Sequence, residues 1–162
     1  MNIKRWIFPF LLVLDVVSKI AALDWISPLA WGGYPFGGIP LFADFFGISF
    51  SLNTIVNTGA AWGLFSGHPG LLFGLRMALV FGLGVYLYIF HRPVTKMASL
   101  WLVAIGAIGN AIDYILYGHV IDFFHFVFWG YSFPIFNLAD SYITLGVIGL
   151  MFTRKVTSVR IV

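Results

Sequence analysis

The chain has 162 residues, 60% of them hydrophobic and only 9% charged, with a mean hydropathy of +0.97. This composition excludes an ordinary soluble domain and indicates one integral membrane domain, since a single span takes about 20 residues. There is no cysteine, which excludes disulfides, thiol catalysis and cysteine-ligated metals. The net charge is +3, but the basic residues form short separate tracts, which argues against a nucleic-acid partner.

Four apolar runs predict membrane-spanning helices, at residues 6–23, 71–90, 97–116 and 138–152. Basic residues precede the first run, separate the second from the third, and follow the fourth. An excess of Lys and Arg marks cytoplasmic loops, so both termini are expected in the cytoplasm. Residues 24–68 and 117–137 then form an extracytoplasmic platform and an extracytoplasmic loop of a single domain, residues 1–162.

The predicted platform is long but apolar, and it is rich in Gly, Pro and aromatic residues. Disordered linkers have low hydrophobicity, so we expect this segment to be ordered. Residues 46–53 alternate apolar with small or polar side chains, which is typical of a half-buried strand. The predicted fold class is membrane α-helical, with four transmembrane helices and a small extracytoplasmic β-sheet whose aromatic residues lie at the lipid headgroups.

Asp15 and Lys19 interrupt the first apolar run, which argues against a cleavable signal peptide. They are four residues apart and share one helix face, with the acid before the base, which is the favoured order. The pair has two interpretations. It ties the first helix to the bundle, or it shapes an active site from behind.

The third run ends in Gly106-Ala-Ile-Gly-Asn110-Ala-Ile-Asp113. Small residues here allow close helix packing, and polar residues often join helices inside membranes. Asn110 and Asp113 lie three residues apart on one face near the outer end. For Asn110, substrate contact and structural support both remain open, whereas support is expected of Asp113.

Asp122 and Asp140 follow the third run and open the fourth, so both lie at the same membrane face if those runs span it. An ionised carboxylate at bilayer depth costs about 2.5–3.5 kcal/mol on insertion scales, so such residues are usually functional. Asn137 is a good N-cap, and simple helix capping is the alternative explanation for Asp140.

Two neighbouring carboxylates share one proton, because both cannot ionise readily. The ionised member can then take a proton from water while the protonated member polarises a carbonyl group, as in aspartic proteases. We expect Asp140 to carry the negative charge, because the helix N-terminus favours it.

Three other interpretations remain. His119, Asp122 and His125 have a spacing that would suit a metal on a helix, but Gly118 breaks the helix and no fourth ligand is visible, so we expect no metal and no cofactor. A proton-coupled carrier would need acids spread along a path through the membrane. A non-catalytic scaffold would leave both aspartates dispensable.

Five motifs in order carry a resemblance to a known family. They are Asp15-Val-Val-Ser-Lys19, Asn57-Thr-Gly59-Ala-Ala-Trp62-Gly63, Gly106-Ala-Ile-Gly-Asn110-Ala-Ile-Asp113, Gly118-His-Val-Ile-Asp122-Phe and Phe136-Asn137-Leu-Ala139-Asp140. Together they resemble lipoprotein signal peptidase (signal peptidase II), an aspartic peptidase family of the bacterial inner membrane. The resemblance covers nearly the whole chain.

The resemblance implies that Asp122 and Asp140 are the catalytic pair. It implies a prolipoprotein substrate with a diacylglyceryl-modified cysteine, cut on the N-terminal side of that cysteine at the extracytoplasmic face. Partners would be this substrate and membrane lipid, for a protein expected to be a monomer; the sheet and an aromatic loop, Phe126–Phe136, would clamp the peptide. The implied substrate-binding residues are Asn57, Gly106, Asn110 and Asn137, and the implied supporting residues are Asp15, Lys19, Asp113, Tyr114 and Ala139.

Two positions depart from the family pattern. Tyr114 stands where the family typically has an Arg that is thought to bind the substrate main chain. The resemblance therefore implies that this contact is remade, by the Tyr114 hydroxyl or by Arg76. Trp62 replaces the usual Phe of its motif, which is a milder change.

Overall fold

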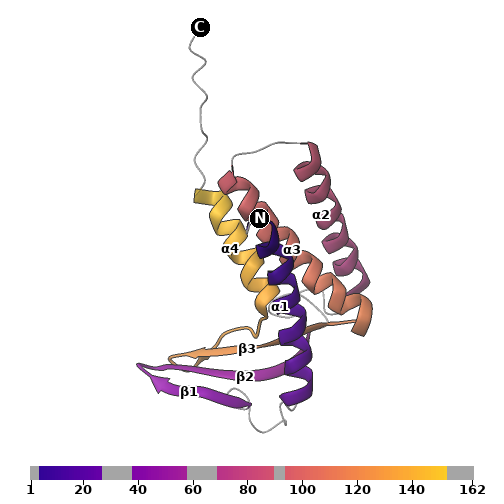
Figure 1. Cartoon of the computed structure of the whole chain (residues 1–162). Coiled ribbons are helices and arrows are strands. Elements are labelled where there is room, and N and C mark those ends of the chain that lie inside the picture. Colours follow the sequence, from indigo (N-terminus) through magenta and orange to yellow (C-terminus); the bar gives the residue numbers. More distant parts are fainter. Residues whose placement is uncertain (1–3, 27–37, 58–68, 90–93, 153–162) are drawn as a thin grey trace.

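Four helices stand beside one another, and a β-sheet projects from one end of them (Figure 1). The computed structural model describes residues 4–26, 38–57, 69–89 and 94–152. The elements in chain order are α1 (Lys4–Trp25), β1 (Ile39–Phe45), β2 (Ile48–Asn57), α2 (Pro69–Ile89), α3 (Val94–Tyr117), β3 (Val120–Phe128), β4 (Tyr131–Ser132) and α4 (Leu138–Phe152).

Each predicted apolar run lies mainly within a helix. Two segments, Trp6–Trp25 of α1 and Met97–Tyr117 of α3, are long and apolar enough to cross a membrane. The α4 helix is shorter, with 15 residues. As the sequence predicted, Gly118 ends α3: its φ is +76°, and its N–H donates to the Tyr114 carbonyl at 2.9 Å.

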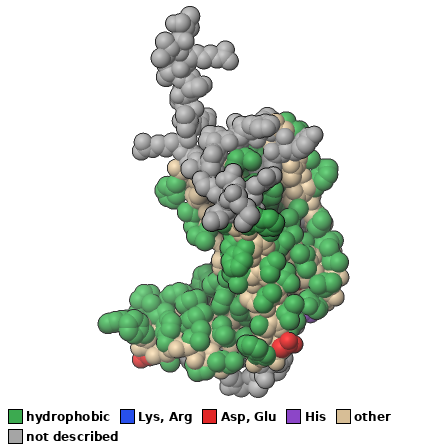
Figure 2. All heavy atoms as spheres, in the orientation of Figure 1, with side chains coloured by type: hydrophobic (Ala, Val, Ile, Leu, Met, Phe, Trp, Pro, Cys, Tyr) green, Lys and Arg blue, Asp and Glu red, His purple; other side chains and the backbone are tan. Residues whose placement is uncertain are grey.

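The helices carry apolar side chains outside and charged side chains inside. On α1, Trp6, Phe10 and Val17 are more than half exposed, whereas Asp15 and Lys19 are each 1% exposed. Figure 2 shows hydrophobic side chains covering both the helices and the sheet. Soluble monomers rarely expose such large apolar patches. This distribution is the one expected of helices that face lipid.

Glycines set the close approach of α3 and α4. A Cβ on Gly106 would lie 2.3 Å from the carbonyl oxygen of Ala139, and one on Gly146 would lie 2.7 Å from that of Ser99. Small residues at such positions let helix backbones pack tightly. The predicted packing role of the small residues in the third run is confirmed at Gly106, and Gly146 adds a second close approach. The contact at Gly106 brings the first turn of α4 against α3.

The sheet is antiparallel with strand order β1-β2-β3-β4. The predicted strand at residues 46–53 is confirmed, since β2 covers most of it. The sequence did not predict a strand within residues 117–137, where β3 occupies Val120–Phe128 and overlaps the start of the aromatic stretch Phe126–Phe136. Side chains on both faces of β3 are largely buried, so its sequence is nearly continuously apolar and lacks the alternation that reveals a half-exposed strand.

The base of the sheet is fixed to the end of α1. Ala22 and Ile26 form a small buried cluster with Phe123 of β3. The Thr54 hydroxyl of β2 lies 3.2 Å from the carbonyl oxygens of both Ala22 and Ile26 and donates to them. This attachment holds the beginning of β3, and with it Asp122, beneath the helices.

Candidate active site

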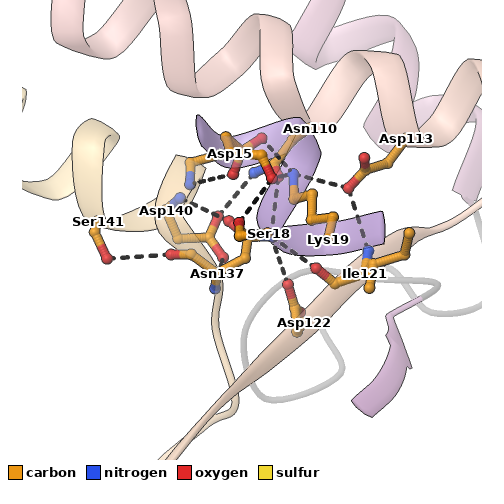
Figure 3. Close-up of polar contacts among 11 residues, drawn as sticks. Asp15, Ser18, Lys19, Asn110, Asp113, Ile121, Asp122, Asn137, Asp140 and Ser141 are labelled. Carbon is orange, nitrogen blue, oxygen red and sulfur yellow. Dashed lines mark hydrogen bonds and ion pairs between the residues drawn. The ribbon is translucent and has the colours of Figure 1, made fainter. Parts of the chain in front are cut away.

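Asn137 joins the two aspartates that the sequence singled out (Figure 3). Asp122 comes from β3 and is 1% exposed, while Asp140 lies in the first turn of α4. The Asn137 side-chain amide donates to Asp122 Oδ1 at 2.7 Å, and the Asn137 backbone N–H donates to Asp140 Oδ2 at 3.3 Å. The fold therefore brings both carboxylates to one residue.

The N-terminus of α4 fixes this geometry. Asn137 Oδ1 accepts the backbone N–H of Asp140 at 2.9 Å, while Asp140 Oδ2 accepts the Asn137 N–H. These reciprocal bonds form a capping box, so the predicted N-cap role of Asn137 is confirmed. Helix capping accounts for only one of the Asp140 oxygens. The other oxygen, Oδ1, accepts the Asn110 side-chain amide at 2.8 Å.

A buried ammonium group lies behind this pair. Lys19 Nζ is 2.8 Å from Asp15 Oδ2, 2.8 Å from Asp113 Oδ2 and 3.1 Å from Asn110 Oδ1. Asp15 Oδ1 accepts the Ala139 N–H at 2.8 Å, and Asp113 Oδ2 accepts the Ile121 N–H at 3.3 Å. The cluster links α1, α3, β3 and α4, as expected for buried charges that are tolerated only when paired and hydrogen-bonded.

The two interpretations of Asp15 and Lys19 therefore describe the same contacts. The pair ties α1 to α3 and α4, and through Asn110 it also lies directly behind Asp140. A proton path through a membrane would instead need acids spread along the helices. Figure 3 shows the labelled aspartates gathered in one cluster around Lys19, Asn110 and Asn137.

Other predicted residues lie around the cluster or outside the described part. Gly106 packs against the carbonyl of Ala139, which is 0% exposed. The Tyr114 ring stacks on Phe73 of α2, with centroids 4.5 Å apart and planes at 15°. Asn57 ends β2 opposite Val120. The side chains of Asn57 and Arg76, and all of Trp62, lie outside the described residues.

The helical spacing on which a metal interpretation would depend does not occur, because Val120–Phe128 form strand β3. Asp122 and His125 lie on a strand, where a three-residue spacing places them on opposite faces. His125 instead faces Asn53 of β2 and Ser132 of β4, each at 2.8 Å. No group of three metal-binding side chains occurs among the residues that the structure describes.

The contacts of His125 are a polar cluster within the sheet that the sequence did not reveal. Burial lowers the pKa of the His125 imidazole. Asn53 Nδ2 also donates to Ser51 Oγ at 2.9 Å, so β2, β3 and β4 are joined by side chains as well as by the backbone. The only available signal was a histidine inside an aromatic run.

The fold and site define a class of protein. It is helical, its surface consists of hydrophobic side chains, and two carboxylates bound to one asparagine lie where its helices meet a sheet. A family model described as signal peptidase (SPase) II matches residues 7–155. The chain belongs to this family, which confirms the resemblance seen in its motifs.

Named relatives agree with this assignment. The chain is 37% identical over 143 residues to the lipoprotein signal peptidase of Chlamydia pneumoniae, which covers 86% of this chain and 83% of the relative. It is 34% identical over 140 residues to that of Clostridium acetobutylicum, covering 85% and 83%.

Solved structures share the fold. A structure described as a bacterial membrane enzyme at 2.3 Å resolution has a TM-score of 0.74 and 29% identity, covering 93% of this chain and 86% of its own. A second one, at 1.9 Å resolution, has a TM-score of 0.72 and 29% identity, covering 93% and 91%.

Proposed function

We propose that this protein is an aspartic endopeptidase that removes the signal peptide from diacylglyceryl-modified prolipoproteins, cutting on the N-terminal side of the lipidated cysteine. The observation that carries the proposal is the contact of one residue, Asn137, with both Asp122 and Asp140. Membership of the signal peptidase II family supports the substrate class. The relatives that are named lipoprotein signal peptidases support it as well.

Asp122 and Asp140 together can carry out every proton transfer that hydrolysis of a peptide bond needs. Ionised Asp140 takes a proton from water as the water oxygen bonds to the scissile carbonyl carbon, and protonated Asp122 gives its proton to the carbonyl oxygen. When the carbon–nitrogen bond breaks, Asp140 returns its proton to the leaving nitrogen, and Asp122 recovers its proton from a hydroxyl of the intermediate. No metal or organic cofactor takes part in these steps.

The substrate residues implied by the motifs belong to the same proposal. Asn57, Gly106, Asn110 and Asn137 would line the path of the peptide. Asp15, Lys19, Asp113, Tyr114 and Ala139 would support the site. The contacts of Asn110 and Asn137 with the acid pair favour this arrangement, since a peptide bond placed between the acids would lie beside both amides.

All four helices are proposed to span the bacterial inner membrane as one domain of a monomer. Both termini would be cytoplasmic, and the acid pair would lie at the extracytoplasmic face. The basic tracts support this orientation. Figure 2 shows a recess between the projecting apolar sheet and the helices, a shape that suits a substrate held by its lipid.

The direct test is cleavage of a diacylglyceryl-modified prolipoprotein peptide by the purified protein in detergent. Asp122→Asn and Asp140→Asn should each lower turnover by about 10³-fold or more, since each removes an essential proton transfer. Asp24→Asn, at an exposed acid on α1, is the matched control and should cleave like the wild type.

Two further arms sharpen the test. The same peptide without its diacylglyceryl group should resist cleavage, and EDTA should leave the rate unchanged. Near wild-type turnover by either Asn variant would overturn the assignment of the pair, and inhibition by EDTA would point to a metal enzyme.

A further inference from the structure

The side-chain amides of Asn110 and Asn137 are each oriented by a neighbouring group that can only donate a hydrogen bond. Lys19 Nζ carries no acceptor and lies 3.1 Å from Asn110 Oδ1. The Asn110 amide nitrogen must therefore face the other way, where it meets Asp140 Oδ1 at 2.8 Å. In the same manner the Asp140 backbone N–H fixes Asn137 Oδ1, so that Asn137 Nδ2 faces Asp122.

As a result, Asp140 and Asp122 accept hydrogen bonds from amides in different surroundings. Asp140 accepts an amide whose carbonyl end is polarised by an ammonium group, and it lies in the first turn of α4, where the helix dipole favours negative charge. Asn137 Nδ2, which donates to Asp122 Oδ1, is a shared donor, because it also lies 3.1 Å from Asn110 Oδ1 and 3.2 Å from the Ile121 carbonyl oxygen. Hydrogen bonds donated to a carboxylate favour its ionised form, so a donor that is shared among several acceptors favours ionisation less.

We infer that Lys19 is a positioning residue: by fixing the Asn110 amide, it makes Asp140 the member of the pair that carries the negative charge. This inference rests on the proposed function, and it adds to it the origin of the asymmetry between the two acids. Without Lys19, Asn110 Oδ1 would keep, among the contacts of the described residues, the donor Asn137 Nδ2, which is shared with Asp122 and the Ile121 carbonyl. The Asn110 amide would then be held more weakly and could rotate to present its oxygen to Asp140, which favours a protonated Asp140.

Lys19 affects the ionisation of Asp140 through its hydrogen bond to the Asn110 amide rather than through its own positive charge. Two carboxylates, Asp15 and Asp113, lie 2.8 Å from its ammonium group, so the trio carries one formal negative charge overall. In the described part of the chain, the titratable groups of this network are Asp15 and Lys19 from α1, Asp113 from α3, Asp122 from β3 and Asp140 from α4, and Tyr142 of α4 lies close enough to feel the charge of Asp15.

A charge-conserving comparison separates the two routes. The double variant Lys19→Met with Asp113→Asn keeps one formal negative charge in the trio but removes the donor to Asn110. We expect the acid limb of its kcat profile to move to higher pH by about one unit, the size expected for losing a hydrogen bond to a charged group. Asp113→Asn alone keeps the donor, and its acid limb should not move to higher pH.

A third variant provides the rescue. Lys19→Gln with Asp113→Asn restores an N–H donor without a charge, so its acid limb should return toward that of the wild type. If Lys19 were purely structural, the two double variants would have lower thermal midpoints, but the acid limbs of all three variants would lie at the same pH. That result would overturn the inference.

Infrared titration of the carboxyl bands gives a measurement that needs neither substrate nor a substituted Lys19. Bands are assigned by their loss in Asp122→Asn and Asp140→Asn. In the wild type, the Asp140 band should be that of a carboxylate at a pH where the Asp122 band is that of a protonated acid. The reverse order would overturn the inference while cleavage still proceeds. Absence of cleavage with the expected order would refute only the proposed function.

Discussion

The polar cluster around Lys19 and the projecting part of the sheet use opposite means of stabilisation. In the cluster, side chains are buried and joined by directional hydrogen bonds among α1, α3, β3 and α4. In the sheet, β1 is exposed along its whole length, and the aromatic rings lie against one another, as Phe50 and Phe126 do with centroids 4.2 Å apart. Hydrogen bonds hold the side chains of the cluster in defined positions, whereas the sheet presents an exposed apolar surface.

This difference matches the two demands of the proposed reaction. Proton transfer needs groups held within hydrogen-bond reach of the reacting atoms. A lipidated substrate needs apolar area, and the exposed residues of the sheet supply it, Phe46 at 81% and Trp129 at 77% exposure. Changes in the cluster should therefore cost stability and activity together, while changes at the end of the sheet should spare stability.

The largest effect on stability is expected from Asp15→Ala. The substitution leaves the Ala139 N–H without its acceptor and removes one of two anions beside the buried ammonium of Lys19. Removing one member of a buried ion pair typically costs about 3–5 kcal/mol. Thermal unfolding in detergent measures the loss. A midpoint within one degree of the wild type would show that the cluster is not what joins the helices.

Gly106→Ala should have the next largest effect. Its Cβ would lie 2.3 Å from the Ala139 carbonyl, so α4 must shift away from α3, and overpacking of this kind costs about 1–3 kcal/mol. Gly82→Ala in α2 is the matched control, because nothing lies within 4 Å of its added Cβ. Since Ala is the better helix former, the control should unfold at the same temperature as the wild type or higher. Equal losses in both variants would contradict the role of close approach.

A smaller effect, dependent on pH, is expected inside the sheet. Burial lowers the pKa of the His125 imidazole, so the unfolded chain takes up this proton before the folded chain does as the pH falls. The stabilisation is complete above the unfolded value of about 6.5 and is lost progressively below it, toward the lower folded pKa. Thermal midpoints measured from pH 7.5 to 5 should show this decline.

His125→Gln should flatten that decline, because it removes the titrating group. Ser132→Ala is its control, since it removes the hydroxyl that faces the ring but leaves the imidazole in place. A decline that persists unchanged in the Gln variant would assign the titration to another group.

The smallest effect is expected at the end of the sheet. Phe46→Ser should change the free energy of unfolding in detergent by less than about 0.5 kcal/mol, as is usual for exposed positions. Phe123→Ser, at a residue that is 4% exposed beside Ala22 and Ile26, should be strongly destabilising by comparison. Similar losses in the two variants would show that the end of the sheet is packed rather than exposed.

The sequence predicted what depends on local pattern. Four apolar runs gave four helices, Gly118 ended α3, Asn137 capped α4, and alternation at residues 46–53 revealed β2. Each of these signals arises from neighbouring residues, because periodicity, capping and helix termination act over one or two turns. Five ordered motifs were also sufficient to indicate the family, and the match of the family model over residues 7–155 confirms it.

Only the tertiary structure decided which partners the polar residues have. That Lys19 reaches Asn110, 91 positions away, depends on how α1 packs against α3. β3 escaped prediction because burial on both faces removes alternation, and the cluster of His125 with Asn53 requires the register of β2 against β3. Long-range hydrogen bonds leave no period in a sequence, since their donors and acceptors meet only after the chain has folded.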